Sequence, residues 1–224
     1  ICPNMATMLM FITTDANISS EMLQKAISND VKNSLNMLSV DRDTSTNDTL
    51  CIMASGLAGN SEITTANADY KKFCEAVHTV TSTLCRMLAR DGEGATKLIE
   101  CRVSGAKSKK DARLSAKSVI NSNLFKSAMF GADANWGRVL CALGYSGANL
   151  DIDKIAVTFR SKAGELPVCV NGRGIEFSEE HAKEVLKEDE IVIDVQLHDG
   201  RYGATAWGCD LTYDYVKING DYRT

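Results

Sequence analysis

Residues 3–12, Pro-Asn-Met-Ala-Thr-Met-Leu-Met-Phe-Ile, place the threonine Thr7 directly before a short apolar run. Such a run is typical of a buried strand, and a β-branched residue often opens one. A chemical interpretation stands beside this structural one. If the Ala6–Thr7 bond were cut, Thr7 would carry a hydroxyl and a free α-amine. A hydroxyl nucleophile needs a base within hydrogen-bond reach, and an α-amine with an ordinary pKa of about 7.7–8.0 accepts a proton near neutral pH.

Beyond this run, apolar spacing predicts long helices that alternate with strands. Helices are expected over residues 21–38, 67–90, 108–120 and 135–143, the last capped by Asp133 or Asn135. Short apolar runs predict strands over residues 49–55 and 96–103. Residues 121–129 fit neither pattern. This order of elements indicates an α/β protein.

Around residues 147–153 the pattern changes to short strands and tight turns. Strands are expected over residues 155–160, 167–170, 191–198, 202–209 and 212–218, in a mostly antiparallel sheet. Asn171-Gly172 and Asp199-Gly200 predict hairpin turns, because these residues tolerate positive φ. Ser178 predicts the start of a helix that ends near Lys187. We therefore place a domain boundary near residue 150, between a main α/β domain (1–150) and a smaller α/β domain rich in antiparallel strands (151–224).

The composition is that of an ordinary globular chain, with 44% hydrophobic residues and a net charge of −4. This charge argues against nucleic acid as a partner, and no apolar run approaches the roughly 20 residues of a membrane helix. No secretory signal is visible, so we expect a cytoplasmic protein. The sequence does not start with methionine. The eight cysteines have no C-x-x-C spacing, and we expect reduced thiols rather than disulfides or zinc ligands.

Several common kinds of site find no support in the sequence. The histidines His78, His181 and His198 lie far apart and no Ser-x-Gly elbow accompanies them, which disfavours a Ser-His-Asp hydrolase. The sequence contains neither a P-loop nor a G-x-G-x-x-G motif after a strand, so nothing in it predicts a nucleotide site. The acidic loop 41–48 lacks the glycine and the terminal glutamate of an EF-hand. We therefore expect neither a metal nor a cofactor.

Segments from one end of the chain to the other share a resemblance. They are residues 1–16 (ICPNMATMLMFITTDA), 41–49 (DRDTSTNDT), 90–97 (RDGEGATK), 131–138 (GADANWGR) and 215–224 (YVKINGDYRT). In this order they resemble the ornithine acetyltransferase family, the bifunctional glutamate N-acetyltransferases of arginine biosynthesis. The family usually has glycine where this chain has Arg42, which suggests that the loop tolerates a side chain.

The resemblance implies that Thr7 attacks the Ala6 carbonyl, cuts the chain at Ala6–Thr7 and then acts as the nucleophile of an acetyltransferase. The acetyl group would move from N2-acetyl-L-ornithine to L-glutamate through acetyl-Thr7, with acetyl-CoA left open as a second donor. Glu93, Asn219 and Thr224 would bind substrate. By residue type alone, Glu93 is a solvated acid in a turn and a C-terminus frays. A carboxylate suits an ammonium group, whereas an amide and a hydroxyl suit an α-carboxylate.

The resemblance also implies a layered sandwich of sheets between helices, of α-β-β-α type, with a smaller C-terminal α/β domain. Residues 1–6 would be the tail of an α portion, and the β portion would begin at Thr7. An acyl transfer needs oxyanion-hole donors, which lie upstream in the family. We therefore expect a complex with the α fragment of the same precursor, as a heterotetramer of two α and two β chains. The other partners would be the small-molecule substrates, with no nucleic acid and no membrane.

Two alternatives remain open. An N-terminal-nucleophile amidase or aminopeptidase would use the same Thr7 chemistry with water as the acceptor. An unprocessed, non-catalytic assembly protein is the other, because Ala6 precedes Thr7 in one continuous chain and its peptide bond masks the amine. Acceptor specificity separates the first alternative from an acetyltransferase, and cleavage at Ala6–Thr7 separates the second.

Overall fold

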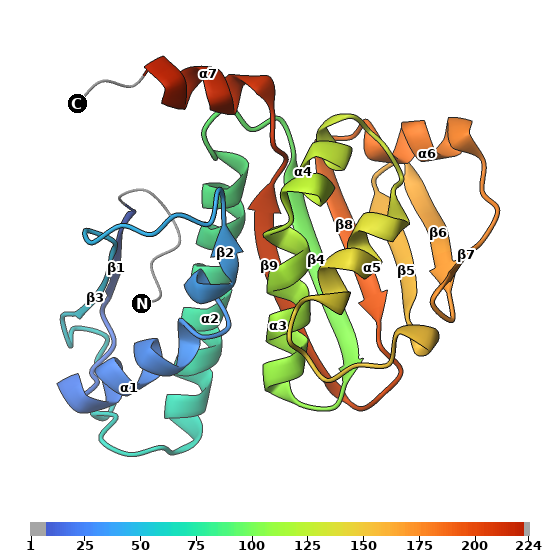
Figure 1. The fold of residues 1–224 in the computed structure, drawn as a ribbon. Helices are drawn as coiled ribbons and strands as arrows, with labels where there is room; N and C mark the ends of the chain where they lie inside the picture. Colours follow the sequence, from blue (N-terminus) through green and yellow to red (C-terminus); the bar gives the residue numbers. More distant parts are fainter. Residues whose placement is uncertain (1–7, 222–224) are drawn as a thin grey trace. The chain divides into compact units, whose positions relative to one another are not determined.

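The computed structural model describes residues 8–221, which form two compact units (Figure 1). The first unit holds the described residues of Ile1–Asn36 and Asp41–Cys85, and the second holds those of Met37–Val40 and Arg86–Thr224. The predicted boundary near residue 150 falls inside the second unit, where strands on both sides of that residue share one sheet. The division of the chain into two domains near residue 150 therefore stays a prediction.

The first unit combines a small parallel sheet with helices. Strands β1 (Leu9–Thr14) and β3 (Thr49–Ala54) pair in parallel, with Leu9 opposite Thr49. Helix α1 (Ser20–Asp30) starts at Ser19, whose side chain accepts a hydrogen bond from the Met22 amide. Helix α2 (Ala68–Arg90) begins in this unit. The core of this first unit includes four buried residues: Met22, Ala26, Ile63 and Tyr70.

The helix predicted over residues 21–38 is wrong in its second half, because α1 ends at Asp30. The Ser34 hydroxyl donates to the Asp30 carboxylate and carbonyl, and the Asn33 amide also donates to that carbonyl. Short polar side chains compete in this way with the helical hydrogen-bond ladder. A 3₁₀ turn, η1 (Leu35–Met37), follows.

The second unit is built on a seven-stranded mixed sheet with the order β2-β9-β4-β8-β5-β6-β7. The strands are β2 (Leu38–Ser39), β4 (Leu98–Ala106), β5 (Ala156–Ser161), β6 (Gly164–Val170), β7 (Arg173–Gly174), β8 (Glu190–Gln196) and β9 (Tyr202–Cys209). Strand β4 is parallel to β8 and antiparallel to β9. The Asn171-Gly172 turn joins β6 to β7 as a hairpin, as predicted.

Helices cover one face of this sheet. They are α3 (Lys109–Ile120), α4 (Asn123–Phe130), α5 (Trp136–Gly144) and α6 (Glu179–Leu186), with a 3₁₀ turn, η2 (Ile152–Lys154), before β5. Helix α3 packs on β4 and β9, and α6 packs on β5 and β6. The predicted caps Asn135 and Ser178 both accept the expected backbone hydrogen bonds. The ambiguous residues 121–129 are mostly helical, in α4.

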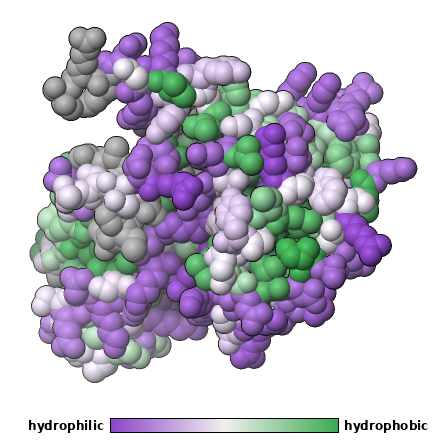
Figure 2. Space-filling model, viewed as in Figure 1, coloured by the Kyte–Doolittle hydropathy of each residue, from purple (hydrophilic) through white to green (hydrophobic). Residues whose placement is uncertain are grey.

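Alternation along the strands gives the sheet one apolar and one polar face. Ile99, Cys101 and Val103 of β4 are buried, and between them Glu100 accepts hydrogen bonds from Arg86, Arg102 and Trp207. On the face of this unit that Figure 2 shows, hydrophilic residues are interspersed with apolar ones. The predicted fold class is therefore confirmed, since helices pack on a mixed sheet in an α/β fold.

Two sequence predictions in the second unit are wrong. Asp199-Gly200 does not close a hairpin, because β4 lies between β8 and β9. The connection passes the end of β4 so closely that a Cβ on Gly200 would lie 2.3 Å from the Ala106 carbonyl oxygen. The strand predicted over residues 212–218 is helix α7 (Tyr213–Asp221), capped by the Thr212 hydroxyl, which accepts from the Tyr215 amide.

The seven cysteines among residues 8–221 form no disulfide, as the sequence predicted. None of the helices among these residues combines the length and the apolar character that a membrane span requires. The described part of the chain also contains no cluster of three or more His, Cys, Asp or Glu side chains placed to hold a metal ion.

Candidate functional site

The loop after α2, Asp91-Gly92-Glu93-Gly94, meets the start of α7 in the second unit. Gly94 has a φ of +66°, and a Cβ there would lie 2.6 Å from the Tyr215 nitrogen. The Gly94 carbonyl accepts a hydrogen bond of 2.6 Å from the Thr212 hydroxyl. Glycine is needed at this position because the backbone has positive φ and another backbone lies against it. The loop glycine thus lets the first turn of α7 pack on the loop.

This packing brings together two residues that the sequence predicted to bind substrate. The Asn219 side-chain nitrogen donates to a Glu93 carboxylate oxygen at 2.8 Å and to the Tyr215 carbonyl at 3.0 Å. Both side chains are exposed, and 126 positions separate them in the sequence. Since the amide nitrogen is engaged with protein oxygens, the pair presents acceptor oxygens to solvent. Acceptors in this arrangement suit a cationic group such as an ammonium.

A buried polar network supports the loop from below. The Asp210 carboxylate, 3% exposed, accepts from the amides of Thr96 and Lys97 at 2.8 and 3.0 Å and from the Thr96 hydroxyl. The Lys97 ammonium nitrogen lies 2.6 Å from the carbonyls of Met129 and Leu186. Burial lowers the pKa of Lys97, and the nearby Asp210 charge opposes this. The network fixes the start of β4, directly after the loop.

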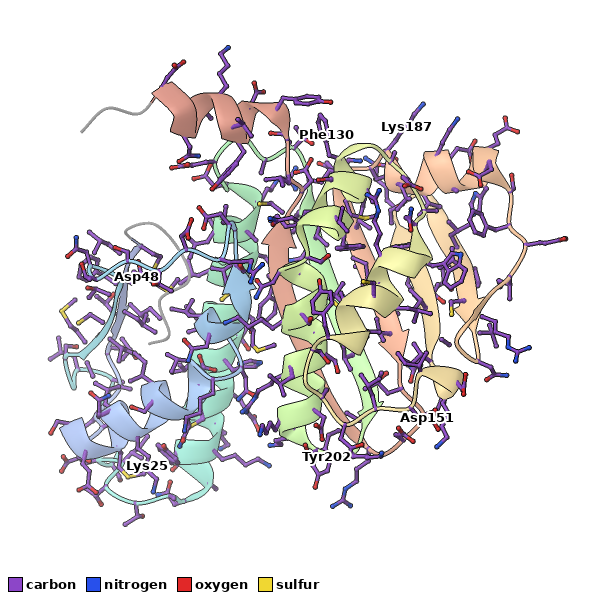
Figure 3. All side chains as sticks on the ribbon, viewed as in Figure 1. Lys25, Asp48, Phe130, Asp151, Lys187 and Tyr202 are labelled. Carbon is purple, nitrogen blue, oxygen red and sulfur yellow. The ribbon has the colours of Figure 1, made fainter. Side chains whose placement is uncertain are left out.

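The start of α7 has a second anchor. Its first residue, Tyr213, meets the Phe130 ring edge-to-face at 5.6 Å, and Figure 3 shows Phe130 at the end of α4. Helix α7 itself has no buried residue. Its position therefore depends on this aromatic contact, on the Thr212 cap and on the Gly94 loop. Thr224, the remaining predicted substrate-binding residue, lies outside the described residues.

In the first unit the structure describes the chain from Met8, so Ala6 and Thr7 also lie outside it. The Met8 amide donates to an Asp48 carboxylate oxygen at 2.8 Å, and the Met8 carbonyl accepts from the Thr49 amide at 2.8 Å. Met8 is thus held on both sides, directly after Thr7. Sequence reasoning missed Asp48, which Figure 3 labels before β3. The feature that could have identified Asp48 is its place as an acidic residue at the end of the loop 41–48, directly before a predicted strand.

The acidic loop 41–48 is a turn-forming segment. The Asp41 carboxylate accepts from the Asp43 amide, and the Ser45 hydroxyl accepts from the Asn47 amide. Arg42 adopts a φ of +78°. This conformation favours glycine, so the loop bears the Arg42 side chain at a cost of roughly 1–2 kcal/mol.

The structure also joins residues that the sequence kept apart. His78 Nδ1 lies 2.7 Å from an Asp30 carboxylate oxygen, and the Ser82 hydroxyl lies 3.4 Å from His78 Nε2. Ser82 sits inside α2, where backbone amides donate along the helix and offer no oxyanion hole. The other Asp30 oxygen accepts from the hydroxyls of Ser34 and Thr81. This cluster therefore joins α1 to α2 and satisfies a buried carboxylate.

Comparisons with known proteins point to one family. The sequence model of the ArgJ family matches residues 1–224. The arginine biosynthesis bifunctional protein ArgJ 1 of Clostridium acetobutylicum is 55% identical over 224 residues, which are all of this chain and 55% of that protein. The ArgJ protein of Caldanaerobacter subterraneus subsp. tengcongensis is also 55% identical over 224 residues, which are 56% of its length. The chain thus spans about half the length of these relatives.

A solved structure agrees with the sequence relatives. The crystal structure of the arginine biosynthesis bifunctional protein ArgJ from Bacillus halodurans matches with a TM-score of 0.91 and 46% identity, over 96% of this chain and 100% of the solved chain. Because the family match covers every residue and the fold agrees, the chain belongs to the ArgJ family.

Proposed function

We propose that this chain is the β portion of an acetyltransferase that moves the acetyl group from N2-acetyl-L-ornithine to L-glutamate. The observation that carries the proposal is the match of all 224 residues to the ArgJ family, whose relatives are named as arginine biosynthesis bifunctional proteins. The contact between Glu93 and Asn219 supports it, because two residues of the expected substrate site share one hydrogen bond.

In the proposed reaction, the Thr7 hydroxyl first attacks the Ala6 carbonyl and the peptide bond shifts to an ester. Water then cleaves the ester and frees the Thr7 amine, which serves as the base for its own hydroxyl. The hydroxyl attacks the acetyl carbonyl of acetylornithine, and ornithine leaves. The glutamate amine attacks acetyl-Thr7 and takes the acetyl group. A tetrahedral oxyanion forms in each step, and its donors are expected upstream of this chain.

The environment of Met8 supports a fixed nucleophile at Thr7. A nucleophile works best when its backbone is already in the reactive geometry. The Asp48 carboxylate and the Thr49 amide hold the two sides of Met8, the residue bonded to Thr7. We therefore propose Asp48 as a positioning residue for both self-cleavage and acetyl transfer.

In the second unit, the acceptor oxygens of Glu93 and Asn219 suit an ammonium group of ornithine or glutamate. Thr224 would contribute a hydroxyl to the same recognition. An additional role of acetyl-CoA as donor is compatible with the same nucleophile, and the acyl-enzyme does not depend on which donor formed it.

The solved Bacillus halodurans chain supports division of the precursor. That chain is matched over its whole length, whereas the curated relatives are matched over little more than half of theirs. We propose that cleavage at Ala6–Thr7 leaves an α fragment bound to the β portion, in a cytoplasmic heterotetramer of two α and two β chains.

Intact mass of the full-length protein, before and after incubation with N-acetylornithine, tests the proposal. We expect a split at Ala6–Thr7 and one added acetyl group on the fragment that begins with Thr7. Thr7→Ala should abolish both changes, and Thr7→Ser should retain them at reduced rate. An unsplit wild-type protein that never gains an acetyl group would overturn the proposal. A split protein that hydrolyses acetylornithine without acetylating glutamate would indicate an amidase.

A further inference from the structure

Two buried side chains of opposite chemical character meet beneath the Gly92 loop of the second unit. Lys126 lies on α4 and Cys209 ends β9, and each is 2% exposed. The Lys126 nitrogen lies 3.6 Å from the Cys209 sulfur and donates to it. The same nitrogen donates to the Val40 carbonyl. A thiol and an amine are thus held in contact in the interior.

The environment of Cys209 differs from that of two other buried thiols. Burial raises the pKa of Cys85 to about 12, and Asp30 adds to this effect. Burial also raises the pKa of Cys101, with contributions from Asp194 and Glu100. Those thiols resist ionisation and are poor nucleophiles. Cys209 instead contacts a lysine, and a neighbouring cation favours the reactive thiolate.

A small oxidant has a short path to this sulfur. A Cβ on Gly92 would lie 2.9 Å from the Cys209 sulfur and 3.2 Å from the Val40 side chain, so the loop backbone lies directly against this sulfur. Gly92 itself is partly exposed. Hydrogen peroxide is close to water in size, so a slight opening of the loop would admit it and exclude bulkier thiol reagents.

We propose that hydrogen peroxide converts Lys126 and Cys209 into a reversible sulfur–nitrogen cross-link. The Cys209 thiolate attacks peroxide, the O–O bond breaks, and the Lys126 ammonium gives one proton to the leaving hydroxide. Sulfenic acid, water and the neutral Lys126 amine form, and sulfur is oxidised by two electrons. The neutral Lys126 amine then attacks the sulfenic sulfur. The S–N bond forms, the S–O bond breaks, and the hydroxyl leaves as water with one amine proton. Two molecules of an added thiol restore thiol and amine and become a disulfide.

The cross-link would affect the candidate site because it lies next to residues that hold the Glu93 loop. It ties α4 to the residue before Asp210, whose carboxylate holds Thr96 and Lys97 at the end of the Glu93 loop. It also draws the Lys126 nitrogen away from the Val40 carbonyl. We therefore expect oxidation to change the KM of the enzyme. Formation of the bond itself does not depend on the proposed acetyl transfer.

The test is peptide mass analysis of the full-length protein after peroxide treatment of the folded protein, thiol alkylation in denaturant and digestion without reductant. We expect one species that joins the Lys126 and Cys209 peptides and has two hydrogens fewer than their sum. It should disappear after treatment with dithiothreitol, and its yield should follow the change in KM.

Matched variants assign the bond. Cys209→Ser and Lys126→Met should abolish the joined species, whereas Cys101→Ser and Lys97→Met, which alter a buried thiol and a buried lysine elsewhere, should retain it. The wild-type protein decides the question even where a variant fails to fold. A Cys209 thiol that stays fully alkylatable after peroxide treatment overturns the proposal. Oxidation of Cys209 to sulfinic acid without a joined species overturns it equally.

Discussion

Replacement Gly94→Ala should damage substrate recognition, whereas its cost in stability should be that of any alanine at positive φ. Gly94 has a φ of +66°, and a new Cβ would lie 2.6 Å from the Tyr215 nitrogen and 2.9 Å from the Asp214 carbonyl carbon. Both atoms belong to the backbone of α7, so the helix must move. This movement separates Asn219 from Glu93 and breaks the bond of Thr212 to the Gly94 carbonyl.

The expected magnitudes come from two separate effects. An L-residue at positive φ costs roughly 1–2 kcal/mol wherever it is placed. Gly147 has a φ of +73°, and a Cβ added there would meet nothing within 4 Å, so Gly147→Ala carries this cost alone. Because α7 has no buried residue, its displacement adds little to the global unfolding energy. A hydrogen bond to a charged group is worth about 1.5–3 kcal/mol, so loss of the Glu93–Asn219 arrangement should lower kcat/KM about 10- to 100-fold.

The assay is acetyl transfer from N-acetylornithine to glutamate by the full-length enzyme, with thermal unfolding measured in parallel. Both variants should lower Tm by a similar few degrees, at roughly 2–4 °C per kcal/mol. Only Gly94→Ala should raise KM and reduce kcat/KM. If the two variants show the same KM, the packing of α7 on the loop does not organise the substrate site and the reasoning fails.

Further predictions test other contacts. Asp48→Asn should move the acidic limb of the kcat/KM profile to lower pH. Asp48 binds the amide of Met8, the residue bonded to Thr7, and its negative charge would favour the ammonium form of the proposed Thr7 amine. An unmoved limb would contradict this. Arg42→Gly should stabilise the protein by roughly 1 kcal/mol in urea unfolding, since its φ is +78°. Asp210→Asn should cost about 2–4 kcal/mol in the same assay, because the amides of Thr96 and Lys97 lose a charged acceptor. Burial lowers the pKa of Lys97 below 10.5, so the unfolded state binds the Lys97 proton more tightly than the folded state does. The stability of the wild-type protein should therefore rise with pH towards 10.5, and Lys97→Met should remove this dependence.

Local patterns were enough to predict most individual elements of this protein. The helices over residues 68–90 and 109–120 follow from apolar spacing, and the caps Asn135 and Ser178 lie where the sequence placed them. The Asn171-Gly172 hairpin followed from turn chemistry alone. These elements could be predicted because residues close together in the sequence both form the recognisable pattern and make the contacts that stabilise it.

Strand order and the state of the last element needed the tertiary structure. Residues 212–218 are rich in the aromatic and β-branched side chains that are typical of a strand. They nevertheless lie in α7 or cap it, because Thr212 caps a helix that packs on Gly94. Likewise, Asp199-Gly200 has hairpin chemistry, but β4 occupies the place between the two strands. No local pattern reveals a strand that comes from elsewhere in the chain and takes that place.

The family, the α/β class and three residues with an expected substrate-binding role could be inferred from the sequence alone. Of these three residues, Glu93 and Asn219 lie among the described residues. Which side chains contact one another became known from the folded chain. Glu93 and Asn219 are 126 positions apart, Lys126 and Cys209 are 83 apart, and Met8 and Asp48 are 40 apart. Contacts over such separations depend on the whole sheet and its helices, because loop closure lets almost any two segments meet and packing selects the ones that do.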